Sequence, residues 1–193
     1  MKKASAIVLF VLFLMPLVAF AQTQEESKAK EPTTKLEAFL AKKGKLLIKE
    51  FYKLGEVPGR YGSKIQCDAL VIYEPGLEGQ RIRGIRVEIT EGGKYERSNT
   101  SFLDMEEIES LSNAIAYMVD LSTKWKSTSK AYTEVIFATR GDFNIGFFQQ
   151  GTEVTAFSTS GYVGKASCYF ASNQDLSTVK TIIDKGLKLL QEK

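Results

Sequence analysis

Two stretches of this chain, residues 108–119 and 176–190, carry apolar side chains at helical spacing, and each follows a series of short strand-like segments. One constant offset aligns the two halves, because it matches the helix starts, the apolar helix positions and a turn glycine together. The matched pairs are Gly93 with Gly161, Phe102 with Phe170, Asp104 with Ser172, Glu107 with Asp175, Ile108 with Leu176, Leu111 with Val179, Ile115 with Ile183 and Val119 with Leu187. An amphipathic helix must bury its apolar face against another element. We therefore predict an internal duplication in which two equivalent helices and their strands share one buried interior.

The segments before the first helix alternate between apolar and polar residues, as half-buried strands do. Gly92-Gly93 and similar pairs separate these segments. Asp104 and Glu107 have the spacing of a capping box at a helix start. The predicted elements of the first half are a short helix at 36–40, strands at 46–54, 64–73, 82–89 and 95–102, and a helix from Asp104 to about Leu121.

The second half repeats this order. Arg140-Gly141-Asp142 spells the adhesion tripeptide that integrins recognise, but a Gly-Asp hairpin turn between two strands accounts for these residues. The predicted strands cover residues 132–139, 143–147, 152–159 and 163–171, and the last helix begins at Ser172. We expect an α+β fold of two tandem β-β-β-β-α repeats, at about 45–122 and 131–191, with mostly antiparallel sheets, each with a packing helix. Together they form a single domain over residues 35–193.

The first 21 residues have the three parts of a secretory signal peptide: a basic start, an apolar middle and small residues before a cleavage site. The small residues are Ala19 and Ala21. The apolar run is shorter than the roughly 20 residues that a membrane-spanning helix needs. We expect cleavage after Ala21 and a periplasmic or secreted product, in which the polar residues 22–34 form a flexible leader.

The chain holds 26 Lys and Arg against 23 Asp and Glu, and it has no His. Without the two lysines of the signal segment the charges nearly balance, whereas dedicated nucleic-acid binders carry a strong basic excess. The lack of His excludes Ser-His-Asp and Cys-His catalytic arrangements and removes the commonest zinc ligand. We assign no catalytic residue, metal or cofactor. An enzyme of this composition would have to use carboxylates or Tyr.

The two cysteines, Cys67 and Cys168, have two interpretations. In an oxidising compartment such a pair favours a disulfide. Alternatively, both are small buried hydrophobic residues that do not meet. The sequence is compatible with both, because it gives no distance between the two residues.

Basic residues at the third and fourth predicted strands form a candidate ligand-binding surface. Arg81, Arg83 and Arg97 would make a basic strip if their strands lie side by side. With Tyr95 nearby, such a strip suits an anionic or single-stranded ligand. The alternative is an ordinary solvated strand face on which neighbouring glutamates neutralise the arginines.

Phe148 is the fifth candidate ligand-binding residue. It lies on the opposite strand face from Phe143 and Phe147, which we expect in the core, so Phe148 is either exposed or packed in a second interface. The expected partners are an unknown protein or an anionic ligand, with a second copy of the chain as a further partner.

Three acidic residues, Asp104, Glu106 and Glu107, cluster at the start of the first long helix. Carboxylates in such a cluster could bind a cation or perform acid–base chemistry. Helix capping and the helix macrodipole place acidic residues in the same turn and account for the cluster without a ligand.

Two tandem β-β-β-β-α units resemble the fold of the plant Whirly proteins, and one such unit is similar to the eukaryotic single-strand-binding transcriptional coactivators. Whirly proteins carry a Lys-Gly-Lys-Ala-Ala-Leu run within a strand. Here Lys43-Gly44-Lys45 is followed by Leu46-Leu47 and precedes the first strand. The resemblance covers the topology of nearly the whole mature domain and implies a sheet surface able to receive an extended ligand. Because a fold does not fix a function, we expect an exported non-enzymatic binding or structural module, with single-strand binding as the alternative.

Overall fold

A computed structural model describes residues 31–162 and 164–193 of the chain. The predicted signal peptide and residues 22–30 of the predicted leader therefore lie outside the described residues. Residues 31–193 belong to one unit by their internal contacts.

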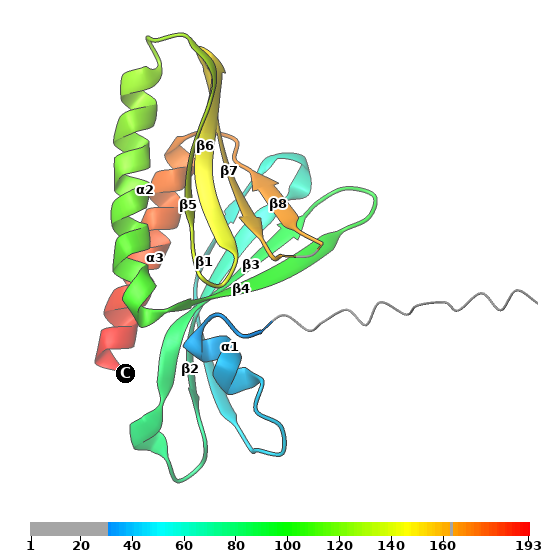
Figure 1. Ribbon diagram of the computed structural model, residues 1–193, viewed down its shortest axis with the longest axis vertical. Helices are drawn as coiled ribbons and strands as arrows, with labels where there is room; N and C mark the ends of the chain where they lie inside the picture. The colour runs from blue at the N-terminus through cyan, green and yellow to red at the C-terminus, as the bar shows by residue number, and fades with distance from the viewer. Residues whose placement is uncertain (1–30, 163) are drawn as a thin grey trace, which may run out of the picture. The chain divides into compact units, whose positions relative to one another are not determined.

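Over these described ranges, eight strands form two four-stranded antiparallel sheets, each in chain order (Figure 1). The first sheet contains β1 (Ile48–Pro58), β2 (Lys64–Tyr73), β3 (Ile82–Glu91) and β4 (Arg97–Asp104). The second sheet contains β5 (Lys130–Ala138), β6 (Phe143–Gly151), β7 (Glu153–Ser160) and β8 (Ala166–Tyr169). The helices are α1 (Lys35–Leu40) before the first sheet, α2 (Met105–Trp125) after it and α3 (Gln174–Glu192) after the second, with short 3-10 turns at η1 (Arg60–Gly62) and η2 (Glu78–Gln80). The predicted α+β class and the tandem β-β-β-β-α order are confirmed.

The turns before the fourth strand of each sheet use matching glycines. Gly93 has a φ of 121° and Gly161 a φ of 95°, values that glycine adopts without the steric cost of a side chain. The two glycines that align in the sequence thus both adopt a positive φ in the turn before the fourth strand.

The two long helices lie side by side and connect the repeats (Figure 1). Helix α3 belongs to the second repeat, yet it packs on β1, β2 and β3 of the first sheet. Helix α2 contacts strands of both sheets, and Ser112 on α2 donates a hydrogen bond to Asp184 on α3. Neither repeat is therefore an independent folding unit, because each depends on a helix that the other also contacts.

One hydrophobic core contains the inner faces of both sheets and the apolar stripes of α2 and α3. It includes Ile85 and Val87 of the first sheet and Phe143 and Phe147 of the second, all fully buried. A smaller cluster lies on the other face of the first sheet, where Leu36 of α1 packs with Leu70 and Ile72 and with partly buried neighbours. The first sheet is thus covered on both faces over part of its length.

Asp104 is the N-cap residue of α2, but its carboxylate does not cap that helix. Its two oxygens instead accept the backbone N–H groups of Lys35 (2.8 Å) and Leu36 (3.2 Å) at the start of α1. The predicted capping box with Glu107 is therefore wrong, since Glu107 accepts the backbone N–H of Arg140. A buried carboxylate satisfies donors wherever the fold brings them, and here it attaches α1 to the first sheet.

The last residues of the predicted leader take part in the domain. Thr34 and Glu37 form a reciprocal capping box at the start of α1. Thr33 donates a hydrogen bond to the carbonyl of Arg140 in the β5–β6 turn. The described domain therefore begins slightly earlier than Lys35, the first helical residue.

The approach of α3 to the first sheet can be tested at Gly186, where an added Cβ would lie 2.7 Å from the side-chain ends of both Ile85 and Leu54. Because the site is filled, Gly186→Leu should lower the free energy of unfolding by about 1–3 kcal/mol, as overpacking does. Lys188→Leu introduces the same side chain at an exposed position of α3 and should change stability by no more than about 0.5 kcal/mol. Denaturant unfolding measures both. Equal stability of the two variants would mean that α3 does not lie against the first sheet as described.

Candidate functional site

The predicted basic strip does not form a single surface. Arg83 pairs with Val71 near the start of β3, whereas Arg97 pairs with Glu91 at its end. Position 91 is eight residues further along the extended strand than position 83, about 26 Å at roughly 3.3 Å per residue. The sequence placed these arginines on neighbouring strands correctly, but an antiparallel hairpin carries them to opposite ends.

The middle of β3 is electrically compensated. Arg86 forms ion pairs with Asp68 (2.9 Å) and with Glu88 on the outer face of the first sheet. Its guanidinium also lies 6.0 Å from the centre of the Phe51 ring. This part of the strand matches the alternative in which glutamates neutralise the arginines.

Phe148 belongs to a row of aromatic side chains that crosses the second sheet. Its ring stacks with Tyr132 of β5 at 5.8 Å and contacts Phe157 of β7 at 6.1 Å, and Phe157 contacts Tyr169 of β8 at 6.4 Å. We call Tyr132, Phe148, Phe157 and Tyr169 the aromatic row. Aromatic side chains on neighbouring strands stabilise one another, so the row is held in place by its own contacts.

The register places the aromatic row on the face of the second sheet that points away from the core. Phe147 is inside the core, and its neighbour Phe148 therefore points outward. Gly146 of β6 pairs with both Ile136 of β5 and Phe157 of β7. Because glycine has no side chain, the sheet face is open between Ile136 and Phe157 at this position. Tyr132 is 59% exposed and Ile136 is 50% exposed. Tyr169 is 44% exposed, whereas Phe157 in the middle of the row is buried, so the apolar side chains exposed to solvent lie toward the β5 and β8 edges of the sheet.

Strand β5 is the edge of the second sheet and is paired only with β6 among the described strands. It runs for nine residues, with a register irregularity near its start, between Lys130 and Tyr132. An edge strand leaves a row of backbone N–H and C=O groups unpaired with any other strand. The exposed side chains of Tyr132 and Ile136 therefore stand beside a strand edge with hydrogen-bonding capacity.

A groove of about 160 Å³ continues the aromatic row where β8 meets the first sheet. We call it the tyrosine groove; it is lined by Arg60, Tyr61, Ser63, Glu91, Gly92, Ser167 and Tyr169. Tyr169 belongs to both features and joins them. Glu91 also forms the ion pair with Arg97 (2.8 Å), so one of the predicted ligand-binding residues lies at the rim.

Tyr61 has an unusual backbone in this groove. Its φ of 58° is the left-handed conformation, which bulky residues rarely adopt, and its side chain is 86% exposed. The surrounding loop fixes it: Gly59 and Ser63 are joined by a backbone hydrogen bond of 2.7 Å, and Gly59 also bridges to Phe170 of the second repeat. Strain of this kind, held by neighbouring structure, is often found at binding sites.

Tyr95 lies in the turn between β3 and β4 and is 78% exposed, with the Lys94 ammonium 5.6 Å from its ring centre. The structure thus places the five predicted residues in three locations. Phe148 is in the aromatic row, Arg97 and Tyr95 are at the groove end of the β3–β4 hairpin, and Arg81 and Arg83 line a cleft at the opposite end of β3. The sequence pattern did not single out four aromatic residues of these two features: Tyr132, Phe157, Tyr169 and Tyr61. The first three lie on the same sheet face as Phe148, so strand alternation together with the correct pairing could have found them.

Each carboxylate of the acidic cluster has a partner within the domain, although Glu107 Oε2 is buried without a hydrogen bond. Asp104 binds α1, Glu106 pairs with Lys35, and Glu107 pairs with Arg140 at 3.4 Å. The hydrogen bond from Lys35 is the main cause that lowers the pKa of Glu106. Among the described residues, no group of three acidic or cysteine side chains could hold a metal ion. These carboxylates connect α1, α2 and the β5–β6 turn.

Cys67 and Cys168 are both free and buried, as in the second of the two interpretations. Cys67 lies on the core face of β2, while the Cys168 sulfur lies 3.4 Å from the Ser63 hydroxyl oxygen. Burial raises the pKa of Cys168 and raises that of Cys67 to about 12.

The chain matches no family model, no curated protein and no solved structure. The resemblance to the Whirly proteins therefore stays an expectation drawn from the order of strands and helices. None of the helices in the described ranges is both long and apolar enough to cross a membrane.

The state of the cysteines is measurable. Because burial keeps both thiols protonated, neither should react with an aromatic disulfide reagent at about pH 8 in the folded protein. After denaturation without reductant, both Cys67 and Cys168 should react. A denatured protein that yields thiols only after reduction would instead demonstrate a Cys67–Cys168 disulfide.

Proposed function

We propose that this chain is an exported, non-enzymatic binding module that takes up an extended polypeptide segment on the outer face of its second sheet. The observation that carries the proposal is the aromatic row together with the exposed side chains of Tyr132 and Ile136 on edge strand β5. Exposed apolar side chains grouped beside a strand edge commonly mark a site of interaction.

An extended polypeptide fits this surface for a geometrical reason. A strand added to a sheet edge pairs its backbone with the edge and places alternate side chains on one face. On β5 that face carries Tyr132, Glu134 and Ile136, next to Phe148 on β6. Apolar side chains at every second position of the bound segment would extend the aromatic row beyond β5. At the β8 end of the row, the tyrosine groove has room for a further side chain.

The charges on the second sheet favour a polypeptide over a single-stranded nucleic acid. Sites for single strands combine aromatic platforms with basic residues that follow the phosphates. Strands β5 to β8 contain one basic residue, Lys130, and two acidic residues, Glu134 and Glu153. Phosphates crossing this face would meet carboxylates rather than cations.

A binding role also agrees with the state of the polar residues in the tyrosine groove. Glu91 is held by Arg97, and Ser63 donates its hydroxyl to the carbonyl of Arg60 at 2.7 Å. Each group is engaged in maintaining the loop, whereas a catalytic base or nucleophile needs a free partner for the substrate.

Export is part of the proposal and rests on the pattern of the first 21 residues. When the full chain is expressed in a bacterium, the product in the periplasm or medium should begin at Gln22, as N-terminal sequencing would determine. Ala21→Phe should prevent processing, because the peptidase site accepts small residues there. An intracellular product that keeps Met1 would contradict export.

Polypeptide binding can be tested with phage-displayed random peptides long enough to span β5. We expect the mature protein to select sequences with apolar residues at alternate positions. Tyr132→Ala should weaken their binding by about tenfold or more, because buried Tyr residues dominate interface energetics.

Tyr117→Ala is the matched control, since Tyr117 is 63% exposed on α2, away from the aromatic row. It should change peptide affinity less than about twofold. Equal effects of the two variants would rule out the aromatic row as the binding surface. Tight binding of oligo(dT), lost in Tyr132→Ala and falling steeply with salt, would favour the nucleic-acid alternative.

A further inference from the structure

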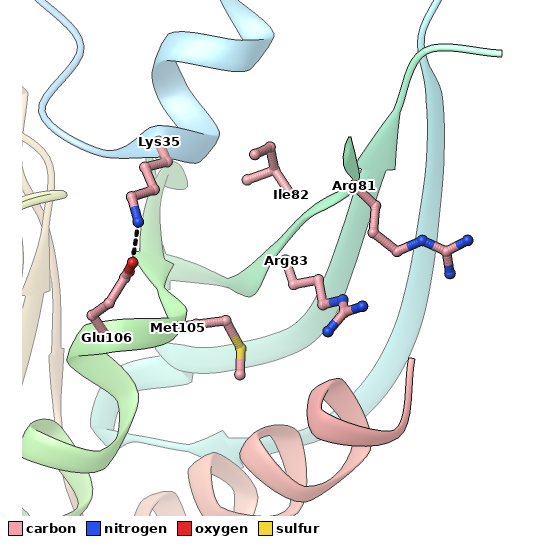
Figure 2. Close-up of a pocket in the computed structure, with 6 residues that line it drawn as sticks. All are labelled: Lys35, Arg81, Ile82, Arg83, Met105 and Glu106. Atoms are coloured by element: carbon pink, nitrogen blue, oxygen red, sulfur yellow. Dashed lines mark hydrogen bonds and ion pairs between the residues drawn. The ribbon is translucent and has the colours of Figure 1, made fainter. Parts of the chain in front are cut away.

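We infer that the cleft at the start of β3 is a second binding site, which accepts a small organic anion through Arg83. The cleft has a volume of about 220 Å³ and is distinct from the aromatic row. Its lining residues are Lys35, Arg81, Ile82, Arg83, Met105 and Glu106 (Figure 2). Three of these are basic and one is acidic, so the cleft carries a net positive charge.

Arg83 has a buried donor with no partner. Its Nε atom is shielded from solvent and makes no hydrogen bond within the described part of the chain. Leaving a buried charged donor unsatisfied is costly, and such a group calls for an explanation, such as a bound water or ion. No hydrogen bond or ion pair within the described residues involves the Arg83 guanidinium, so an anion in the cleft would give this charge a partner.

The other charges in the cleft are already engaged. Lys35 and Glu106 form an ion pair on one side, as Figure 2 shows, and Arg140 approaches Glu106 to 4.0 Å from outside the cleft. The single carboxylate is therefore neutralised by its own partners. It does not compensate the two arginines, which extend from the other side.

Arg81 is held in place by main-chain oxygens and by an aromatic ring. Its Nε donates to the carbonyl of Glu78 (2.8 Å) and one terminal nitrogen donates to the carbonyl of Lys193 (2.9 Å), while its guanidinium lies over the Tyr73 ring. Hydrogen bonds from Tyr52 and Tyr73 are the main causes that lower the pKa of Glu50, and the charge of Arg81 lowers it further. Backbone hydrogen bonds are the main causes that lower the pKa of Glu78, where the charge of Arg81 also contributes. Arg81 is thus fixed by the groups around it, and Arg83 is the basic lining residue without a partner among the described residues.

The lining defines the class of ligand. A guanidinium fork matches the planar or tetrahedral oxygens of a carboxylate or a phosphate. Ile82 and Met105 line the same cleft between the basic groups (Figure 2) and suit an apolar body. The cleft is therefore assigned to a small molecule in which an anionic oxygen group is attached to a compact apolar part.

Isothermal titration of the mature protein with phenyl phosphate, benzoate and inorganic phosphate, at constant ionic strength, tests the assignment. At least one of the two aromatic anions should bind saturably with one site per chain, and more tightly than inorganic phosphate. Whichever of phenyl phosphate and benzoate binds more tightly shows whether the site prefers a phosphate or a carboxylate group. Arg83→Gln should weaken that binding by about tenfold or more, as loss of a charge-assisted contact does.

Arg97→Gln is the matched control, because it removes the same charge from the opposite end of the β3–β4 hairpin. Its affinity for the anion should stay within about twofold of wild type. Thermal unfolding without ligand separates a binding role from a structural one: Arg83→Gln should melt no lower than wild type, since Nε has no partner to lose.

Three results would overturn the assignment. The first is that neither phenyl phosphate nor benzoate binds saturably. The second is that wild type and Arg83→Gln bind the aromatic anion with equal affinity. The third is that benzoate does not bind and phenyl phosphate binds no more tightly than inorganic phosphate.

Discussion

The inner faces of both sheets are buried by two helices that lie against each other, α3 on β1 to β3 and α2 on strands of both sheets. Gly186 allows this arrangement, because a side chain there would have to displace the ends of Ile85 and Leu54. Since each helix is shared, the hydrophobic effect acts on the two repeats together rather than on each alone. The helices thereby occupy the faces that could otherwise bind ligands, and leave outer faces, sheet edges and the junction between sheets.

The junction is where the duplicated halves are joined most closely. Gly59 of the first repeat bridges to Phe170 of the second, and Ser101 and Ser160 share a buried hydrogen bond of 2.7 Å. An added Cβ at Gly59 would collide with the Cys168 sulfur, so the loop that carries Tyr61 is fixed by packing against β8. The tyrosine groove is therefore a consequence of how the sheets meet.

Periodicity predicted most of the fold and little of the site. Alternation identified all eight strands and matched β2 at both ends, because side chains of a half-buried strand must alternate. It could not reveal that Asp104 binds the start of α1, since that partner is distant in sequence. Arg83 and Arg97 were grouped by sequence proximity, yet hairpin register separates them. Phe148 was placed outward correctly, but its neighbours in the row are known only from the pairing of β5, β7 and β8.

The two repeats share a topology but differ in what covers their outer faces, and for this reason we propose polypeptide binding at the second. On the first sheet, α1 packs on Leu70 and Ile72, and the ion pairs of Arg86 fill the adjoining surface. Within the described part of the chain, no such helix covers the outer face of β5 to β8, where aromatic side chains take those positions instead. A duplicated domain with one covered and one uncovered face retains the stability of the first and gains the exposed apolar surface of the second. Binding at the second sheet then requires no opening of the shared core.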